Sequence, residues 1–580
     1  MGRGERRSSD RHRQSEGGAS RGVCARRGWL VFGLLALALA IPGAAVAQPS
    51  AEDLDAVFSE WDRDDSPGCA AGALRNGEFV FRRAYGMANL DYGIPLTPDS
   101  IFRMASVSKQ FTVAAVLVAE DQGLLSLEDP LRKHFPDLPA WADPVRIRHL
   151  VHHTSGIRDY LVVMSLRGFG DDAHFTDADV LAALRQLERL NFEPGTEYLY
   201  SNSGYWLLAE LIPRVSGLTL RQFAAEHLLG PVGMTGSHFH DRHREIVPGR
   251  ATGYRPRPEA EGGGFEEDMT TLEMVGDGGL YTSVNELRHW ERMFLDPASL
   301  GPDLLRRLTA PGSFNDGSAQ DYAGGLGLGE YRGLATVSHG GSFVGFRTYA
   351  LRFPDQAFAV FVLCNSASAD PGALSRRVAD LFLAEEMAPA RDPARAGTAE
   401  ELPIRPGQFW EAASASLASI ERKDAGPVLV RGGGETALST VEGELAGFAG
   451  DTRLRLEPRP QGFVLRQPGQ RDFRYVRIER YQRDEGQPAF ADMVELAGAY
   501  RCRELGVRYE VRLDARPGLT LVGVNGERAL EPVFEDPEGP SPVYAWDRGT
   551  IRFLPDPGEA RARGFELAAG RARGFLFVRE

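Results

Sequence analysis

The spacing of apolar and polar positions changes along this 580-residue chain near residue 385. Before it, short apolar runs near both ends of the segment predict strands, and the longer patterns between them suit helices. Beyond residue 404 helical patterns nearly vanish, and residues 507–514 alternate apolar and polar positions, which predicts a half-buried strand. We therefore expect a mixed helix-and-sheet part followed by a β-rich part.

In the first part, residues 69–74 and 78–84 predict two strands around Arg75-Asn76-Gly77, which is a hairpin turn signal. Later apolar runs predict a strand that starts at residue 334 and ends in His339-Gly-Gly341, and strands over 346–353 and 357–363. Predicted helices cover residues 55–61, 205–215, 284–294 and 373–383. This order favours one α/β domain with an antiparallel sheet.

The second part begins after a stretch rich in Ala, Pro and Arg, which predicts a linker over residues 386–404. Short strands at the observed spacing suggest small β-sandwiches or barrels. The segment Arg561-Ala-Arg-Gly-Phe565 recurs as Arg571-Ala-Arg-Gly-Phe575, which predicts a final hairpin. We expect a domain over residues 48–385 and two β-rich domains over 405–488 and 489–580.

The first 47 residues have the pattern of an export signal. Residues 1–28 are rich in Arg, 29–41 are apolar but too short to span a bilayer, and Ala45-Val46-Ala47 fits a cleavage site. We expect a cleaved signal peptide and a periplasmic or secreted protein without a stable membrane span. Arg26-Arg27 fits a twin-arginine signal; an ordinary secretory leader and an uncleaved anchor are the alternatives.

Charge and cysteine content narrow the function classes. The formal net charge is −14, and residues 1–47 carry eight Arg against three acidic residues, so the chain without them is near −19. This balance argues against a nucleic-acid or anionic-membrane partner. Outside the leader only Cys69, Cys364 and Cys502 remain, with no metal-type spacing, so at most one disulfide can form within the chain.

The strongest chemical signal is Ser106 followed by Lys109 at the start of a predicted helix that ends near Gly123. Residues three apart on a helix share a face, and the helix N-terminus favours developing negative charge. The chain has three lysines, and only Lys109 has a Ser three residues before it. Because a buried Lys can release a proton and Arg cannot, the pattern predicts an acyl-transfer nucleophile. A surface Lys on a helix is the alternative.

Two further motifs follow in the chain. Tyr200-Ser201-Asn202 precedes a predicted helix, where a loop Tyr and a capping Asn would be the simpler explanation. His339-Gly340-Gly341 ends a predicted strand. The pair His152-His153 raises the alternative of a metal site, but no metal-ligand spacing accompanies it, so we expect structural histidines. The Gly-rich residues 276–279 lack a phosphate-loop pattern and predict tight backbone packing.

In this order, the three motifs resemble those of the serine β-lactamase and DD-peptidase superfamily. The resemblance is greatest to the branch of class C β-lactamases, D-alanyl-D-alanine carboxypeptidases, D-aminopeptidases and family VIII-type esterases, and covers about residues 52–385. It implies an α/β fold of the α+β type, with an antiparallel sheet flanked by helices. The β-rich end resembles the barrel-like pair of D-aminopeptidases. Further landmarks are His152-His-Thr-Ser-Gly156, Glu193-Pro-Gly195, Tyr200-Ser-Asn-Ser-Gly204, Leu229-Gly-Pro-Val-Gly-Met234 and Gly278-Gly-Leu280.

The resemblance implies roles for the motif residues. Ser106 would be the nucleophile that forms an acyl-enzyme, and Lys109 and Tyr200 would handle its proton. Asn202 would bind the substrate amide or orient Lys109. The backbone N–H groups of Ser106 and Ser342 would form the oxyanion hole, and the small residue Gly341 would let the strand approach the substrate.

The acylation base stays open between Lys109 and Tyr200. A Lys cation about 4 Å from a Tyr hydroxyl contributes roughly 4 kcal/mol at an effective dielectric near 20. That would lower the Tyr pKa by about three units from its usual value near 10. Tyr200 would then be a base near neutral pH, provided that desolvation does not cancel the effect.

One departure from the superfamily concerns substrate recognition. His339-Gly340-Gly341 stands where β-lactamases and many penicillin-binding proteins have Lys-Thr-Gly, and His is mostly neutral at pH 7. The missing cation favours an esterase, amidase or D-aminopeptidase over penicillin hydrolysis or D-Ala-D-Ala recognition. We expect a small-molecule or peptide substrate bound around His339, Gly341 and Ser342. We expect neither cofactor nor metal.

A disulfide, catalytic activity, the substrate and the oligomeric state stay open at this point. In the superfamily's sheet the first and last strands are neighbours, so Cys69 and Cys364 could lie close enough for a bridge. A non-catalytic binding or sensing module is the alternative to an enzyme. An α/β-hydrolase is excluded because its Gly-x-Ser-x-Gly motif occurs only at Gly18-Ala-Ser-Arg-Gly22, inside the leader. Substrate identity and oligomeric state are not predicted.

Overall fold

The computed structural model describes residues 49–170, 173–389, 402–424, 426–432, 434–441, 444–449, 452–467, 470–478, 490–514, 518–535, 542–555 and 562–580. The predicted leader and most of the predicted linker lie outside these ranges. Residues Pro49–Glu580 pack as one unit. Among the described residues, no helix combines the length and apolar character needed to cross a membrane.

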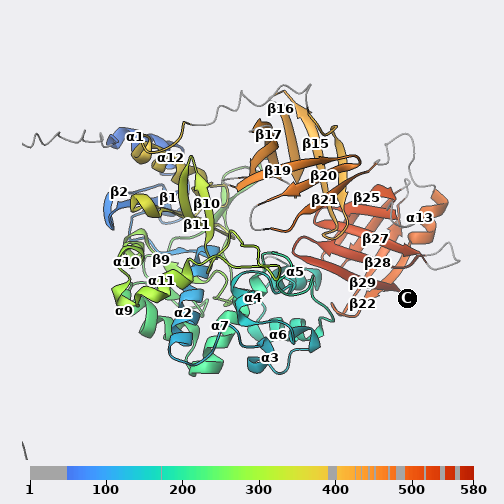
Figure 1. The fold of residues 1–580 in the computed structure, drawn as a ribbon, viewed down its shortest axis with the longest axis horizontal. Helices are drawn as coiled ribbons and strands as arrows, with labels where there is room; N and C mark the ends of the chain where they lie inside the picture. Colours follow the sequence, from blue (N-terminus) through green and yellow to red (C-terminus); the bar gives the residue numbers. More distant parts are fainter. Residues whose placement is uncertain are drawn as a thin grey trace, which may run out of the picture. The chain divides into compact units, whose positions relative to one another are not determined.

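A six-stranded antiparallel sheet forms the centre of the first part (Figure 1). Its order is β10-β11-β12-β13-β1-β2, so the first strands in sequence pair with the last. The strands are β1 (Cys69–Arg75), β2 (Glu78–Tyr85), β10 (Gly327–Tyr331), β11 (Leu334–Phe343), β12 (Phe346–Phe353) and β13 (Phe358–Cys364). Asn76 and Gly77 have φ of 53° and 76°, as the predicted hairpin between β1 and β2 requires.

The first and last strands meet at their cysteines. Cys69 pairs with Cys364 between β1 and β13, and the two form a disulfide. The bridge that the sequence left open is therefore present. The remaining cysteine of the described chain, Cys502, is free and buried.

Both faces of the sheet are covered by helices (Figure 1). Along β1, Ala70 and Leu74 face the core that contains α10, whereas Ala71 and Ala73 face the core beneath α12. This alternation is the period of two expected for a strand, here with both faces apolar. The helices that matter below are α2 (Lys109–Asp121), α4 (Ile147–Val151), α5 (Tyr160–Leu166), α6 (Asp177–Gln186), α7 (Asn202–Ser216), α10 (Val284–Leu295) and α12 (Pro371–Leu383).

Two predicted boundaries need correction. The first helix, α1, spans Ala51–Val57 instead of 55–61, because the Ser50 hydroxyl accepts a hydrogen bond from the Asp53 backbone and starts the helix early. Only a short turn, Ser59–Trp61, follows it. Strand β11 continues beyond its His-Gly-Gly to Phe343, since Ser342 and Phe343 still pair with β12.

The β-rich part consists of two closed barrels, which confirms the predicted fold class. The first contains β14 (Gly407–Glu411), β15 (Ser416–Lys423), β16 (Gly426–Arg431), β17 (Gly434–Val441), β18 (Glu444–Ala449), β19 (Thr452–Arg459), β20 (Gly462–Arg466) and β21 (Phe473–Ile478). The second contains β22 (Gly498–Cys502), β23 (Val507–Leu513), β24 (Leu519–Gly523), β25 (Gly526–Glu535), β26 (Pro542–Trp546), β27 (Gly549–Pro555), β28 (Ala562–Ala569) and β29 (Ala572–Arg579). Strands β28 and β29 form the predicted final hairpin.

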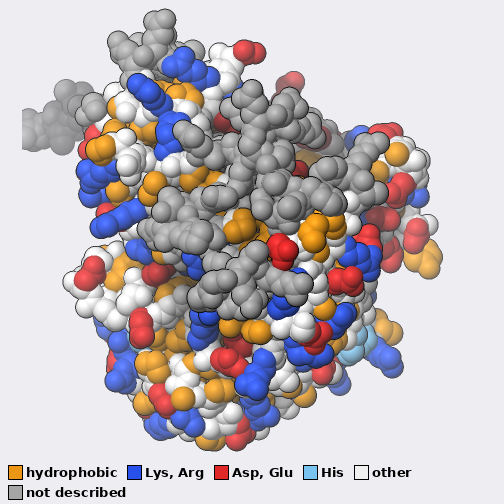
Figure 2. Space-filling view, turned by 90° about the vertical axis from the view of Figure 1, so that its right-hand side faces the viewer, with side chains coloured by type: hydrophobic (Ala, Val, Ile, Leu, Met, Phe, Trp, Pro, Cys, Tyr) orange, Lys and Arg blue, Asp and Glu red, His pale blue; other side chains and the backbone are white. Residues whose placement is uncertain are grey.

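The barrels pack differently. The apolar core of the second barrel is continuous with the core of the first part on the side of the sheet that contains α2, α7 and α10, called the helical half below. The Tyr509 hydroxyl of this barrel donates to the Leu166 carbonyl at 2.8 Å. The first barrel encloses a separate core. On the face turned to the viewer in Figure 2, the described acidic and basic side chains are interspersed.

Candidate active site

Ser106 lies in a one-turn 3-10 helix, Ala105–Ser108, that leads directly into α2. Ala105 has a φ of 46°, an uncommon value for a residue with a side chain. Strand β11 passes close to this turn. A Cβ on Gly341 would lie 2.3 Å from the Met104 carbonyl oxygen and 2.2 Å from Thr348 Oγ1, so only glycine fits there. The strand edge and the serine are thus held side by side.

Lys109 is fully buried at the first position of α2. Its Nζ lies 3.3 Å from Ser106 Oγ, 2.9 Å from Asn202 Oδ1 and 2.6 Å from the Asp277 carbonyl oxygen. Burial lowers the pKa of Lys109 to about 7, with the cation of Arg571 acting in the same direction and Asp277 acting against both. The amine is therefore about half neutral at pH 7 and becomes neutral as the pH rises.

This set of neighbours orients the amine. The Asn202 side-chain oxygen and the Asp277 carbonyl only accept hydrogen bonds, and they can take the two N–H groups of a neutral amine. The third direction from Nζ points at Ser106 Oγ, where the lone pair can accept the serine proton. The arrangement can therefore activate the hydroxyl as a nucleophile.

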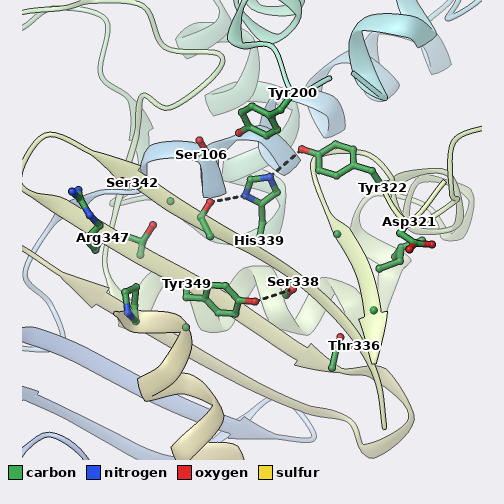
Figure 3. A pocket seen from close by; sticks show the side chains of 18 of the residues that line it. Ser106, Tyr200, Asp321, Tyr322, Thr336, Ser338, His339, Ser342, Arg347 and Tyr349 are labelled. Carbon is green, nitrogen blue, oxygen red and sulfur yellow. Dashed lines mark hydrogen bonds between the residues drawn. The ribbon is translucent and has the colours of Figure 1, made fainter. Parts of the chain in front are cut away.

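Tyr200 lies beside Ser106 with its hydroxyl turned toward the serine (Figure 3). The hydroxyl is buried, and no described residue meets hydrogen-bond geometry with it. Burial raises the pKa of Tyr200 well above 10, and the Ser106 hydroxyl opposes this only in part. Lys109 Nζ faces the Tyr200 ring, 4.8 Å from its centroid. The sequence suggested that the Lys109 cation would lower the pKa of Tyr200, but the loss of solvent around the hydroxyl has the larger effect and raises it.

His339 is held by two contacts, with Nδ1 2.7 Å from the Gly340 carbonyl oxygen and Nε2 3.0 Å from the Tyr322 hydroxyl. Burial, aided by Lys109, lowers the pKa of His339 to about 4, so the ring is neutral. No permanent charge stands at this position, as the sequence indicated.

The structure brings together all the site residues that the sequence selected. Ser106, Tyr200, His339, Gly341 and Ser342 line one cavity of about 750 Å³ (Figure 3). Asn202 holds Lys109 from the first position of α7, which favours the orienting role over the substrate-binding one. The wall also contains charged groups of both signs and two residues of the first barrel: Arg347, Arg376, Asp321, Asp370, Gln467 and Gln470.

A second cavity, of about 190 Å³, also reaches Ser106. Its wall includes Asn202, Asp277 and Ser342, together with two cations, Arg103 and Arg571. Arg571 lies between β28 and β29, so the final hairpin of the second barrel contributes to this cavity.

Several residues at the site were not selected from the sequence. Asp159 is fully buried, caps α5 by accepting from the Leu161 N–H, and accepts from the Asn202 N–H at 2.8 Å. Its position before a helix was a readable capping signal. The carbonyl of Asp277 gave no such signal. Arg571 was noticed only as part of a repeat.

Of the two adjacent histidines, His153 lies among residues of the Tyr-x-Asn loop. His153 Nδ1 accepts from the Ser201 N–H at 3.1 Å, and its ring lies 4.2 Å from that of Tyr200. Burial keeps its pKa well below 6.5. His153 therefore positions the Tyr-x-Asn loop, which fits the predicted structural role.

One group of described side chains is spaced closely enough to share a metal ion. Neither His152 nor His153 belongs to it. It consists of His238, His240 and Glu245. Arg221 already binds Glu245 and also Asp241, so a cation occupies the carboxylate.

Comparison with known proteins identifies the family. The Beta-lactamase family model matches residues 54–385, more than half of the chain, so this protein belongs to the Beta-lactamase family, a family of hydrolases. The resemblance seen in the sequence is thereby confirmed.

Relatives named D-aminopeptidase extend the similarity into the barrels. Those of Gluconobacter oxydans and Brucella canis are each 29% identical, over 80% and 88% of this chain and 85% and 93% of their own. Two solved structures share the fold. The octameric penicillin-binding protein homologue from Pyrococcus abyssi has 22% identity and a TM-score of 0.52, covering 73% of this chain and 99% of its own. SurE has 24% identity and a TM-score of 0.51, covering 74% and 99%.

Proposed function

We propose that this protein is an exported serine hydrolase that cleaves an ester or amide through an acyl-enzyme on Ser106. The observation that carries the proposal is the fully buried Lys109, whose Nζ contacts two groups that only accept hydrogen bonds and lies 3.3 Å from Ser106 Oγ in its third direction. A fully buried Lys with a shifted pKa beside a hydroxyl suits a catalytic base better than a structural ion.

In the proposed reaction, Lys109 accepts the Ser106 proton as Oγ attacks the substrate carbonyl. The backbone N–H groups of Ser106 and Ser342 stabilise the resulting oxyanion, each worth a few kcal/mol in comparable sites. Lys109 then gives this proton to the leaving group, to which the Tyr200 hydroxyl, kept protonated because burial raises its pKa, donates a hydrogen bond. Water then attacks the acyl-enzyme while Lys109 takes its proton. Lys109 returns this proton to Ser106 Oγ as the bond to the acyl group breaks and the acid product leaves.

The substrate class follows from the relatives and from His339. The D-aminopeptidase names of the relatives support a peptide-like amide. The neutral His339 supplies no cation at the strand position where β-lactamases and many penicillin-binding proteins have Lys, which favours amidase or esterase activity over penicillin hydrolysis. The disulfide supports export, because such bridges persist in oxidising compartments.

Intact-mass measurement tests the proposal. The protein would be exposed to a fluorophosphonate, a short-chain p-nitrophenyl ester, a D-alanyl ester and a cephalosporin. We expect a covalent adduct on the wild type that is absent from Ser106→Ala and retained by Ser338→Ala, since Ser338 lines the same cavity. An adduct that persists on Ser106→Ala would contradict Ser106 as the nucleophile, and no adduct on a folded wild type would favour the non-catalytic binding module.

A further inference from the structure

The small cavity beside Ser106 is lined by two arginines to which the proposed reaction gives no role. Arg103 belongs to the short strand β5 (Phe102–Arg103), and Arg571 lies in the turn between β28 and β29. They reach the cavity from parts of the chain that are far apart in sequence. Both guanidinium groups are permanent cations at physiological pH.

Arg103 is a buried cation without a counter-charge in contact. Its side chain is 3% exposed and makes no ion pair or hydrogen bond to any described residue, and its Nε is buried without a partner. It lies 5.1 Å from the ring centroid of Phe343 and 6.0 Å from that of Tyr281. Ring faces compensate a cation only in part, and a buried charge is costly unless it is paired. An anion in the cavity would complete the pairing.

The acidic side chain on the cavity wall, that of Asp277, already has a hydrogen-bond partner. The Asp277 carboxylate accepts from the Tyr160 hydroxyl at 3.1 Å, and burial raises the pKa of Asp277. Arg103 interacts with it only at longer range, because no nitrogen–oxygen distance between them falls within ion-pair range among the described contacts. Asp277 therefore leaves Arg103 free to bind a ligand.

Arg571 is fixed in place on the cavity wall. It lies 3.2 Å from Asp159 Oδ2, and its guanidinium stands 5.5 Å from the centroid of the Tyr200 ring. The backbone around it is also held, since the Arg571 carbonyl accepts from Asn191 Nδ2 at 3.1 Å and the Arg573 carbonyl accepts from Arg158 Nε at 3.0 Å. The Arg571 side chain keeps 34% exposure, so part of its guanidinium can bind a ligand.

The proposed reaction would divide the substrate between the two cavities. Tyr200, which donates to the leaving group in that reaction, lines the large cavity and is absent from the wall of the small one. The leaving group therefore belongs in the large cavity. The acyl group faces the small cavity, whose 190 Å³ suits a short chain.

We propose that Arg103 and Arg571 bind a carboxylate at the far end of the acyl group, so that the preferred substrates are amides or esters of short dicarboxylic or acidic acyl groups. This inference rests on the proposed function. It differs from a site for the free amine of an aminopeptidase substrate, which would need an unengaged carboxylate at this place.

Matched p-nitrophenyl esters test the inference. The esters carry a fumaryl, a crotonyl or a 4-aminocrotonyl group, which end in an anion, a methyl group and a cation. Their trans double bond keeps the carboxylate away from its own ester. The quantity compared is the fumaryl-to-crotonyl ratio of kcat/KM in the wild type and in Arg571→Met, so that intrinsic ester reactivity cancels.

We expect the ratio to fall roughly tenfold or more in Arg571→Met and in Arg103→Met, as for loss of one partner of a desolvated charge pair. The crotonyl rate itself should fall in Arg571→Met near pH 7, because Arg571 lowers the pKa of Lys109, and this change cancels in the ratio because both esters depend on the same base. Arg189→Met is the matched control, because Arg189 binds the Gly574 carbonyl of the same hairpin without lining the cavity. It should leave the ratio unchanged. An unchanged ratio in Arg571→Met, or a wild-type preference for the 4-aminocrotonyl ester, would overturn the inference.

A binding measurement separates this inference from the proposed function. Calorimetric titration of Ser106→Ala, which cannot be acylated, should show that monomethyl fumarate binds roughly tenfold or more tightly than methyl crotonate. The added Arg571→Met change should abolish the difference. Equal binding of the two ligands contradicts the anion site even if the wild type is an active hydrolase. Preferential binding without any acylation would contradict only the proposed reaction.

Discussion

The two barrels each contain eight strands in sequential order, but they relate differently to the candidate active site. The first encloses its own core and adds Gln467 and Gln470 to the wall of the large cavity. The second shares its core with the helical half and brings Arg571 to Asp159, one contact from Asn202. Two barrels of the same topology can therefore differ in their role at the active site: one only lines a cavity, and the other contacts residues that hold the catalytic groups in place. The number and order of strands do not distinguish the two.

The contacts that hold each barrel sharpen this comparison. Arg158 is fully buried and paired with Glu504 of the second barrel, whose side chain is 6% exposed. The first barrel meets the hydrolase part through Arg471, 2.8 Å from Glu197 and 19% exposed. Loss of the buried pair should therefore damage the site far more than loss of the other.

The largest expected effect comes from Glu504→Ala. Removing one partner of a buried ion pair typically costs about 3–5 kcal/mol, because the remaining charge is left uncompensated. Urea unfolding should show this loss in stability, together with lower activity at temperatures where the variant is still folded. Glu197→Ala removes the partner of Arg471 in the first barrel and a longer contact, of 3.4 Å, to Arg573 of the second. It should cost less than Glu504→Ala, because Arg471 keeps Glu411 as a partner. Equal losses in the two variants would contradict the distinction between the barrels.

Next in size is the pH dependence of stability caused by Lys109. Its pKa is about 7 in the folded protein and near 10.5 when unfolded, so the unfolded chain binds more protons between these values. The wild type should therefore gain stability as pH rises from 7 to 10, by up to about 4 kcal/mol. Below pH 7 Lys109 is protonated in both states, so the full cost of burying its charge lowers the free energy of unfolding. Lys109→Met should remove this gain, as measured by urea unfolding at several pH values. A parallel pH profile in wild type and variant would contradict a buried, shifted Lys109.

A smaller effect is expected on the pH dependence of acylation, where the charge of the second barrel should matter and the first barrel should not. Arg571 of the second barrel lowers the pKa of Lys109, so Arg571→Met should move the alkaline rise of the acylation rate to higher pH. Gln467→Ala and Gln470→Ala in the first barrel remove no charge and should leave the midpoint in place. The readout is the pH profile of the acylation rate constant with a neutral ester. A shift in the glutamine variants, or none in Arg571→Met, would show that the second barrel does not tune the site.

The smallest expected effect is on substrate affinity. Gln467 and Gln470 line the large cavity, and replacing either with Ala should raise KM about threefold or less, as for an exposed contact, with kcat unchanged. Steady-state kinetics with a peptide amide and with a short p-nitrophenyl ester would check this. A large fall in kcat would mean that the first barrel also takes part in the chemistry.

The sequence predicted the parts of this molecule whose signals are local. Ser106 and Lys109 lie three residues apart. The hairpin around Asn76-Gly77 and the last hairpin are each formed by strands that follow one another directly in the sequence, so spacing alone located all three features. Strand order followed from the family resemblance, which also placed Cys69 near Cys364.

Long-range contacts and burial could not be predicted in this way. Arg158 and the hairpin residue Arg573 are 415 positions apart, and nothing in either neighbourhood indicates the other. The choice between Lys109 and Tyr200 depended on desolvation, which a sequence does not give. Coulomb's law alone favoured lowering the Tyr200 pKa, whereas the structure turns its ring face toward the amine and buries its hydroxyl.

The central claim is that neutral Lys109 activates Ser106. The most direct test is the rate constant for fluorophosphonate addition to Ser106, followed by intact mass between pH 5 and 9 in wild type, Lys109→Met and Tyr200→Phe. We predict a rise with a midpoint near pH 7 in the wild type, the same midpoint in Tyr200→Phe, and a much slower reaction without this rise in Lys109→Met. A midpoint that survives in Lys109→Met, or that disappears in Tyr200→Phe, would contradict the assignment of Lys109 as the base.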